Sequence, residues 1–257
     1  MSQASAVTPI ATRPGSVQSI QRAFMLLETI ADHGGTMGLS AMAESSELPL
    51  PTIHRLVRTL VELGYVRQDS NRQYILGPAL TRLGESAAAT LTVWARPYLQ
   101  KLVDDLGESA NLAMLEGDQI VYVAQAQSRQ SMRMFTEVGR RVLPHSTAVG
   151  KAIMSTMPES DVLDLLRRTG MPAHTDTTIT TPQDFITTLR QSAKTGYAID
   201  EGEQELGVRC VAVQVLGVPT PLAISVSGPA TRMGDDVIDK AVPLLQAAGQ
   251  NLSRDLA

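Results

Sequence analysis

The sequence predicts an α+β protein with two domains, on three observations. First, residues 50–63 (LPTIHRLVRTLVEL) place apolar side chains at helical spacing on one side and small or basic side chains on the other. Second, two short strand-like runs joined by turn-forming residues follow this helix directly. Third, the rest of the chain mixes strand pairs with helices, which is typical of a mainly antiparallel sheet with helices packed on it.

Three helices are predicted before the strand pair, at residues 17–33, 39–46 and 50–63. The predicted buried stripes are Val17, Ile20, Phe24, Leu27 and Ile30 in the first helix, and Ile53, Leu56, Val57, Leu60 and Leu63 in the third. Two helices joined by a short turn and followed by a hairpin form a winged helix-turn-helix, which is typical of DNA-binding proteins. The alternative is a helical pair with a hairpin that binds no nucleic acid.

The polar face of the third helix supplies hydrogen-bonding groups of the kind that read base edges in the major groove. The predicted DNA-contacting residues are Thr52, His54, Arg55 and Arg58 on this helix, and Arg67 and Arg72 on the hairpin. The two hairpin arginines are expected to contact phosphates or the minor groove. For Arg58 the alternative is a surface salt bridge to Glu62, four residues on. His54 is equally suited to a backbone phosphate.

The remaining elements are predicted from composition and from the positions of turn-forming and helix-breaking residues. An Ala- and Leu-rich helix at 79–93 is predicted to link the domains, with the boundary near Trp94 and a separate helix at 96–106. The predicted domains are a loose tail at 1–15, a winged helix-turn-helix at 16–77, a linker helix at 78–94 and a second domain at 95–257. Strands are predicted at 109–116, 119–126, 132–138, 197–200, 208–216 and 222–227, and helices through Lys151 to Thr156 and at 159–168, 182–194 and 237–256.

Composition limits the class of protein. No run of 18 apolar residues occurs and the N-terminus lacks the order of a signal peptide, so we expect a cytoplasmic protein that spans no membrane. The single cysteine, Cys210, excludes an internal disulfide and a cysteine zinc cluster, and neither a metal nor a cofactor is expected. Residues 1–76 hold six arginines and six acidic residues, so the net charge of −4 arises further along the chain. A local basic patch in the N-terminal region and a net negative charge in the rest of the chain fit a DNA-reading module attached to a second domain.

In several motifs the sequence resembles the IclR family of transcriptional regulators, over roughly residues 16–255. The motifs are VQSIQRAFMLLE, LPLPTIHRLVRTLVELGYV, YILGPALTRLG, LPHSTAVGKA, GYAIDEGE, GVRCVAVQV and AISVSGP. The resemblance implies a winged helix domain, a linker helix and a GAF/profilin-like effector-binding domain. It also implies a homodimer or a dimer of dimers on double-stranded, partly palindromic operator DNA. Among the branches of the family, the chain most resembles repressors of allantoin and ureide use.

One departure from the family concerns the turn of the helix-turn-helix. Glu47 stands before Leu48-Pro49, where the family usually has glycine. If this position needs a positive φ, glutamate is less favourable there than glycine by about 1 kcal/mol. The departure affects stability more than the assignment. Pro51 replaces a small polar residue, and proline is tolerated in a first helical turn.

The second domain carries a candidate site for a small organic acid. Residues 146–151 enter a helix whose free N–H groups favour an anion, although a simple capped helix start is the alternative. The run is not a P-loop, because His145 and Ala152 stand where that motif needs glycine and serine or threonine. The resemblance implies that an effector carboxylate binds at this loop and at an Asp, a Cys and two Ser on nearby strands. The matching ligand-binding positions are Ala148, Val149, Asp200, Cys210, Ser225 and Ser227.

Some of these positions have simpler interpretations. Ser225 and Ser227 are two residues apart on a strand, so they face the same side. Cys210 can instead be a small buried apolar residue, and Asp200 can be a turn acid in the acidic run GYAIDEGEQE.

Together with these patterns, the resemblance implies a ligand-responsive repressor of a catabolic operon that a small carboxylate such as glyoxylate or allantoate releases from its operator. The alternatives are an aromatic-acid effector, an activator, or a DNA-binding protein whose second domain only forms oligomers. A thiol enzyme built on Cys210, His145 and Asp200 is a remote alternative. Cys210 lies in an apolar strand-like run rather than in an accessible electropositive setting, so we expect no enzyme.

Overall fold

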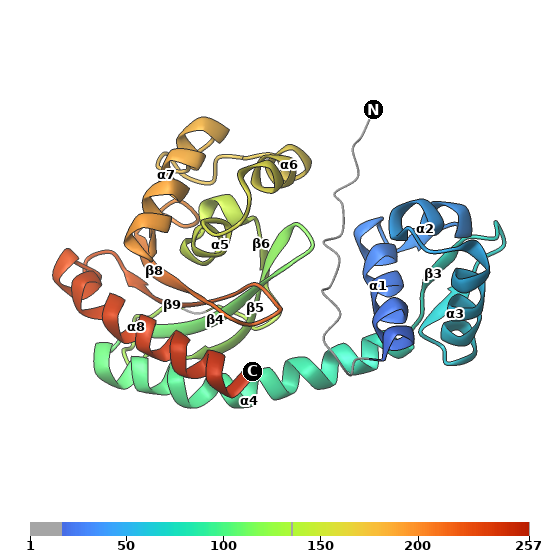
Figure 1. The fold of residues 1–257 in the computed structure, drawn as a ribbon. Helices are drawn as coiled ribbons and strands as arrows, with labels where there is room; N and C mark the ends of the chain where they lie inside the picture. The colour runs from blue at the N-terminus through green and yellow to red at the C-terminus, as the bar shows by residue number, and fades with distance from the viewer. Residues whose placement is uncertain (1–16, 135, 257) are drawn as a thin grey trace. The chain divides into compact units, whose positions relative to one another are not determined.

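The computed structural model describes residues 17–134 and 136–256 and divides into two compact units, Met1–Ala87 and Ala88–Ala257 (Figure 1). The predicted tail at 1–15 lies outside the described residues. Among the described helices, none is both long enough and apolar enough to cross a membrane.

The N-terminal unit has the predicted arrangement of helices and hairpin, with one added strand. Its elements are α1 (Gln18–Asp32), β1 (Thr36–Met37), α2 (Leu39–Ser46), α3 (Leu50–Glu62), β2 (Val66–Gln68) and β3 (Tyr74–Leu76). β2 and β3 form the antiparallel hairpin, and β1 pairs with the other edge of β3. The sequence did not predict β1, because two residues are too few to show a strand pattern.

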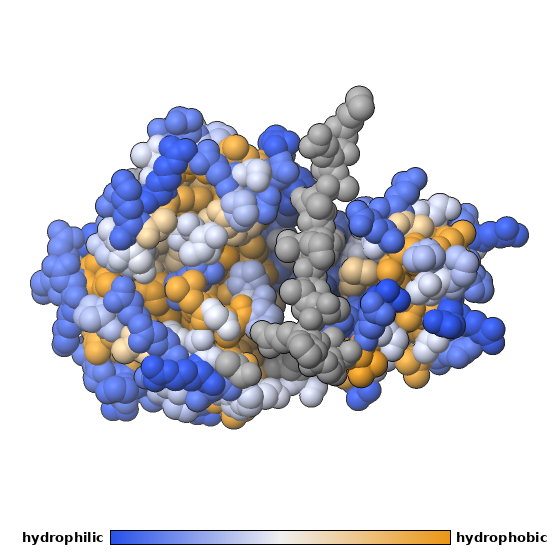
Figure 2. Space-filling view, viewed as in Figure 1, coloured by the Kyte–Doolittle hydropathy of each residue, from blue (hydrophilic) through white to orange (hydrophobic). Residues whose placement is uncertain are grey.

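The predicted apolar stripes are correct only in part. In α1, Leu26, Leu27 and Ile30 are buried, whereas Ile20 and Phe24 are 56% and 59% exposed. In α3 the core takes Ile53, Val57 and Leu60, while Leu63, just past the helix end, is 61% exposed. Apolar residues therefore reach the surface of this unit, as Figure 2 also shows.

The two helices predicted on either side of Trp94 form one helix, α4 (Ala79–Leu106), with Pro97 inside it. The prediction of two separate helices was therefore wrong. A proline inside a helix removes one backbone hydrogen bond and costs roughly 3 kcal/mol. Ala95, Leu99 and Leu102 are each at most 2% exposed in the core of the C-terminal unit. Their burial offsets the cost of Pro97.

The C-terminal unit is built on a six-stranded antiparallel sheet in the order β6-β5-β4-β9-β8-β7. α4 and α8 pack on one face of the sheet, and α5 packs on the other together with α6 and α7 (Figure 1). The strands are β4 (Ser109–Glu116), β5 (Gln119–Ala126), β6 (Arg141–Val142), β7 (Ala198–Glu201), β8 (Val208–Val215) and β9 (Leu222–Pro229). The helices are η1 (Pro144–Ser146), α5 (Ala148–Met154), α6 (Glu159–Thr169), α7 (Pro182–Thr195) and α8 (Asp235–Leu256). The predicted α+β architecture with a mainly antiparallel sheet is confirmed.

The strand predicted at 132–138 is absent from the described residues of that segment, so this prediction was wrong. Met132 and Val138 are 70% and 56% exposed, so their apolar side chains do not mark a buried face. The short strand β6 comes later and pairs with Ile120 and Val121 of β5.

Candidate functional site

α3 presents the predicted reading face to solvent. Ile53 and Val57 anchor the helix in the core, which leaves His54, Arg55 and Arg58 exposed and Thr52 half-buried. Because the anchoring and reading residues alternate at helical spacing, the core fixes the direction of the polar face.

Arg58 also makes the alternative contact predicted for it. Its Nε lies 3.0 Å from Glu62 Oε1, and the two side chains are 75% and 61% exposed. A pair this exposed contributes about 0.3–0.5 kcal/mol in a helix. Such a pair is readily exchanged for a contact with DNA.

A compact turn shapes the hairpin. Asp69 Oδ1 accepts hydrogen bonds from the backbone N–H groups of Asn71 (2.9 Å) and Gln73 (2.8 Å). Arg72 in this turn has a φ of 60°, and both Arg67 and Arg72 are exposed. The hairpin thus presents two exposed cations, as expected of a wing that contacts the DNA backbone.

Glu47 at the end of α2 has the predicted positive φ, with φ 55° and ψ 18°. We expect Glu47→Gly to stabilise the protein by about 1 kcal/mol, because glycine adopts this conformation without a Cβ penalty. Glu44→Gly is the matched control, because Glu44 is exposed in the interior of α2, where glycine lowers stability by about 1 kcal/mol. Thermal unfolding of the two variants should shift in opposite directions. Equal shifts would contradict the strain at Glu47.

The register of the sheet brings the predicted strand residues of the second site together. Cys210 on β8 lies opposite Asp200 on β7 and opposite Ser227 on β9. Two residues before Ser227 on β9, Ser225 pairs with Ala212 of β8 on one side and with Asn111 of β4 on the other. Because alternate residues of a strand share a face, all four predicted strand residues lie on the face that α5 covers.

α5 brings the remaining two predicted residues onto the same face. Ala148 and Val149, each 1% exposed, pack in one cluster with Cys210, Ala212 and Ala223. Thr147 caps the helix, because its Oγ1 accepts a hydrogen bond of 3.1 Å from Gly150 N. A Cβ on Gly150 would lie 2.1 Å from Pro144 O, so glycine allows η1 to pack directly on α5.

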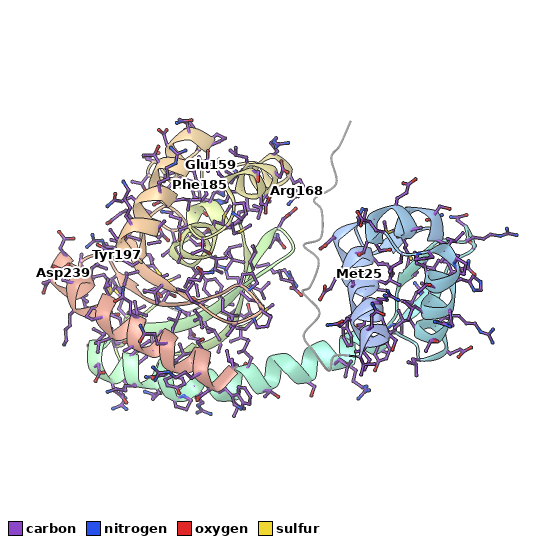
Figure 3. All side chains as sticks on the ribbon, in the orientation of Figure 1. Met25, Glu159, Arg168, Phe185, Tyr197 and Asp239 are labelled. Atoms are coloured by element: carbon purple, nitrogen blue, oxygen red, sulfur yellow. The ribbon has the colours of Figure 1, made fainter. Side chains whose placement is uncertain are left out.

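Helices α6 and α7 hold α5 from outside. Phe185 of α7, labelled in Figure 3, is fully buried and packs in a cluster with Met154 of α5 and Leu165 of α6. Arg190 of α7 donates a hydrogen bond of 2.8 Å to Glu159, the first residue of α6. This helical layer packs against the C-terminal end of α5.

A buried ion pair that no local sequence pattern reveals lies beside the site. Lys151, 1% exposed, forms an ion pair with Glu203 and donates a hydrogen bond of 2.8 Å to Ile199 O. Lys151 was visible in the STAVGKA run, but its partner 52 residues away was not.

Asp200 lies next to this pair, and its Oδ1 accepts a hydrogen bond of 2.7 Å from Glu203 N. Burial raises the pKa of the Asp200 carboxyl to about 6, although this hydrogen bond and the charge of Lys151 oppose the rise.

Comparison with known proteins shows which family has this architecture. Residues 19–70 match the model of the IclR helix-turn-helix domain, and residues 87–254 match that of the bacterial transcriptional regulator IclR C-terminal domain. The acetate operon repressor of Salmonella typhimurium is 36% identical over 242 residues, which cover 91% of this chain and 88% of that protein. This chain belongs to the IclR family. The transcriptional repressor IclR of Escherichia coli K12 is 34% identical and covers 88% of this chain and 86% of its own length.

Solved IclR structures share the fold. The Thermotoga maritima IclR is 26% identical with a TM-score of 0.63, and the match covers 93% of this chain and 98% of that one. An IclR regulator from Silicibacter is 30% identical with a TM-score of 0.64, over 93% of this chain and 96% of that one. The HTH-type transcriptional repressor AllR of Escherichia coli K12 is 26% identical, over 96% of this chain and 93% of its own length. The family is therefore confirmed, and its regulators bind operator DNA and small-molecule effectors.

The IclR-family relatives are transcriptional regulators rather than enzymes. The chemistry of the site agrees with this. Burial and the charge of Asp200 raise the pKa of the Cys210 thiol to about 12, so the nucleophilic thiolate is strongly disfavoured. His145 Nε2 bonds instead to Pro172 O at 3.0 Å, and burial lowers the pKa of this imidazole. These features do not form an activated thiol.

Proposed function

We propose that this DNA-binding regulator represses a catabolic operon and is released from its operator by a small carboxylate that binds between α5 and the sheet. The observation that carries the proposal is the Ser225 hydroxyl. Ser225 is fully buried, and its Oγ makes no hydrogen bond of good geometry to the described residues; the polar group beside it is the Cys210 thiol, a weak partner. An unsatisfied buried hydroxyl costs about 1–3 kcal/mol, which a ligand oxygen would recover.

The surroundings of Ser225 suit a small polar ligand. Cys210, Ser227 and Asp200 lie on the same face of the sheet, and Ala148 and Val149 close the site from above. Small side chains and hydroxyl groups suit a compact polar acid such as glyoxylate or allantoate. The ureide branch remains a proposal, because identity to AllR is 26% against 36% to the acetate operon repressor. An aromatic acid is the alternative effector, and activation is the alternative sign of regulation.

The effector prediction is tested by thermal shift with glyoxylate, allantoate and 4-hydroxybenzoate. We expect a small carboxylate to raise the melting temperature of the wild type and to have little effect on Ser225→Ala, which lacks the free hydroxyl. A valid hit should also release operator DNA. No shift with any acid would contradict the proposed effector class and favour a second domain that only forms oligomers.

The DNA prediction distinguishes a residue that contacts bases from a residue that contacts the phosphate backbone. We expect Arg55→Ala on α3 to weaken binding to the selected operator by about 10- to 100-fold, since a bidentate arginine–guanine contact is worth about 1–3 kcal/mol. Arg67→Ala on the hairpin should instead weaken binding to all sequences and reduce the salt dependence by about one phosphate contact. Binding is measured on double-stranded DNA selected by the wild type from a random pool, at several salt concentrations. Equal loss of specificity in both variants would contradict the separate roles.

We also propose a cytoplasmic homodimer, or a dimer of such dimers, joined through the DNA-binding unit. Ile20 and Phe24 leave an apolar strip exposed on α1, which a second copy can cover. Two copies of α3 would then reach half-sites about one helical turn of DNA apart. An effector that changes this spacing lowers operator affinity without touching the reading residues.

A further inference from the structure

A tyrosine on β5 borders the effector site between α5 and the sheet. Tyr122 packs in one cluster with Ala148 of α5 and Cys210 of β8. In the sheet order β5 lies two strands beyond β9, so Tyr122 approaches the site from the side opposite to Asp200 on β7. The residue is half-buried. Tyr122 therefore forms part of the wall of the effector site on the β5 side.

The sheet leaves room for the ring of Tyr122 to extend toward the centre of the site. Tyr122 pairs with Ala113 on β4, and Ala113 pairs with Ala223 on β9. Both alanines belong to the same cluster as Tyr122, so two methyl groups lie between this tyrosine and β8. An aromatic side chain is long enough to reach past a directly paired residue. The ring can therefore lie over the alanines, toward Cys210.

The Tyr122 hydroxyl is a neutral donor near the polar groups of the site. Burial raises the pKa of the phenol, and Cys210 and Asp200 raise it further when they are ionised, while Arg140 opposes the rise. Because such interactions weaken with distance, the phenol lies near both groups. It keeps its proton at neutral pH, and among the described residues none forms a hydrogen bond with it. The hydroxyl is thus available to a ligand.

We propose that Tyr122 determines which acids the effector site accepts: its hydroxyl donates a hydrogen bond to the bound acid, and its ring restricts the site to small acids. This inference rests on the proposed function. A carboxylate only accepts hydrogen bonds, and a hydroxyl without an internal acceptor can donate to it without first breaking another bond. The ring occupies space that an aromatic acid would need. The effector class is therefore a small acid such as glyoxylate or allantoate.

Tyr122→Phe tests the hydroxyl, because it removes one oxygen and keeps the ring. Affinity for glyoxylate or allantoate, whichever the wild type binds, is measured by calorimetry on the full chain. We expect it to fall about 10-fold or more, as for the loss of a hydrogen bond to a charged group. The melting temperature of the ligand-free variant should not fall, because no internal hydrogen bond is lost.

Tyr197→Phe is the matched control for the hydroxyl. Tyr197, labelled in Figure 3, packs in the cluster on the opposite face of the sheet. Its variant should bind the acid within about 2-fold of the wild type, since distant sites act independently. Equal affinities of Tyr122→Phe and Tyr197→Phe would overturn the role of the Tyr122 hydroxyl.

Tyr122→Ala tests the ring, because it frees the space that the ring occupies. We expect the wild type to bind 4-hydroxybenzoate at least about 10-fold more weakly than the small acid, and Tyr122→Ala to bind 4-hydroxybenzoate about 10-fold more tightly than the wild type does. Tyr122→Leu, which keeps more of the apolar packing, serves the same purpose if the alanine variant does not fold. A wild type that prefers 4-hydroxybenzoate, or no gain in the folded variant, would overturn the role of the ring.

The same titrations separate this inference from the proposed function. If the wild type binds none of the three acids, the proposed function fails and this inference fails with it. If the wild type binds a small acid and Tyr122→Phe binds that acid equally well, the proposed function stands and only the hydrogen bond from Tyr122 is contradicted.

Discussion

Gly150→Ala is expected to destabilise the C-terminal unit by about 3 kcal/mol and to weaken effector binding at least 10-fold. The new Cβ would lie 2.1 Å from Pro144 O and 2.6 Å from Pro144 Cα, so backbone must move rather than a side-chain tip. Moving η1 away from α5 displaces the N–H groups at the start of that helix, where the effector carboxylate is proposed to bind. Denaturant unfolding can be followed by Trp94, the single tryptophan, which lies in the C-terminal unit.

Gly84→Ala provides the control for this experiment. Gly84 is in α4, and apart from its own helical turn no described residue comes within 4 Å of its would-be Cβ, so alanine should leave the C-terminal unit unchanged or slightly more stable. A Gly150→Ala protein with wild-type stability and effector affinity would show that η1 and α5 are not packed as described.

The N-terminal unit could be predicted well because its determinants are local. Helical spacing gave α3, and the turn residues around Asp69 gave the hairpin. The predictions that were wrong concern residues whose local sequence pattern is overruled by tertiary packing. In α1 the sequence offers more apolar residues than the small core can cover, so periodicity assigned Phe24 to a stripe that the fold leaves exposed. In α4, core contacts of Ala95 and Leu99 outweigh the helix-breaking tendency of Pro97.

The effector site could be predicted only where the family motifs covered it. Strand spacing placed Ser225 and Ser227 on one face, but the pairing of Cys210 with both Asp200 and Ser227 depends on the order of β7, β8 and β9. Asn111 could have been noticed from its alternation with Ser109 in SANLAMLE, since both face the same side as the site. Its contact with Ser227 joins residues 116 positions apart, which no local pattern reveals.

Lys151→Met is expected to destabilise the C-terminal unit by about 3–5 kcal/mol at pH 8, because removing one partner of a buried ion pair leaves the other charge uncompensated. Lys151 and Glu203 are 1% and 6% exposed at their side chains. The double variant Lys151→Met/Glu203→Leu should recover most of the loss, since a buried ion pair can often be replaced by apolar residues. Trp94 fluorescence in denaturant measures both variants. A double variant as unstable as the single one would contradict this account of the pair.

The pH dependence of the Lys151→Met loss follows from Asp200. Its pKa is raised from 3.8 to about 6 in the folded protein, so folding favours the protonated carboxyl. Asp200 therefore contributes most to stability below about pH 4, and this contribution is lost as the pH rises through about 6. Lys151 opposes the rise in the pKa of Asp200, so removing Lys151 should raise this pKa further. The loss of folding stability on ionisation of Asp200 should then be larger and should occur at higher pH. The deficit of Lys151→Met should thus be smaller at pH 5 than at pH 8, and the difference should shrink when Asp200→Asn is added. A deficit that is the same at both pH values would mean that Lys151 stabilises the site through packing rather than through its charge.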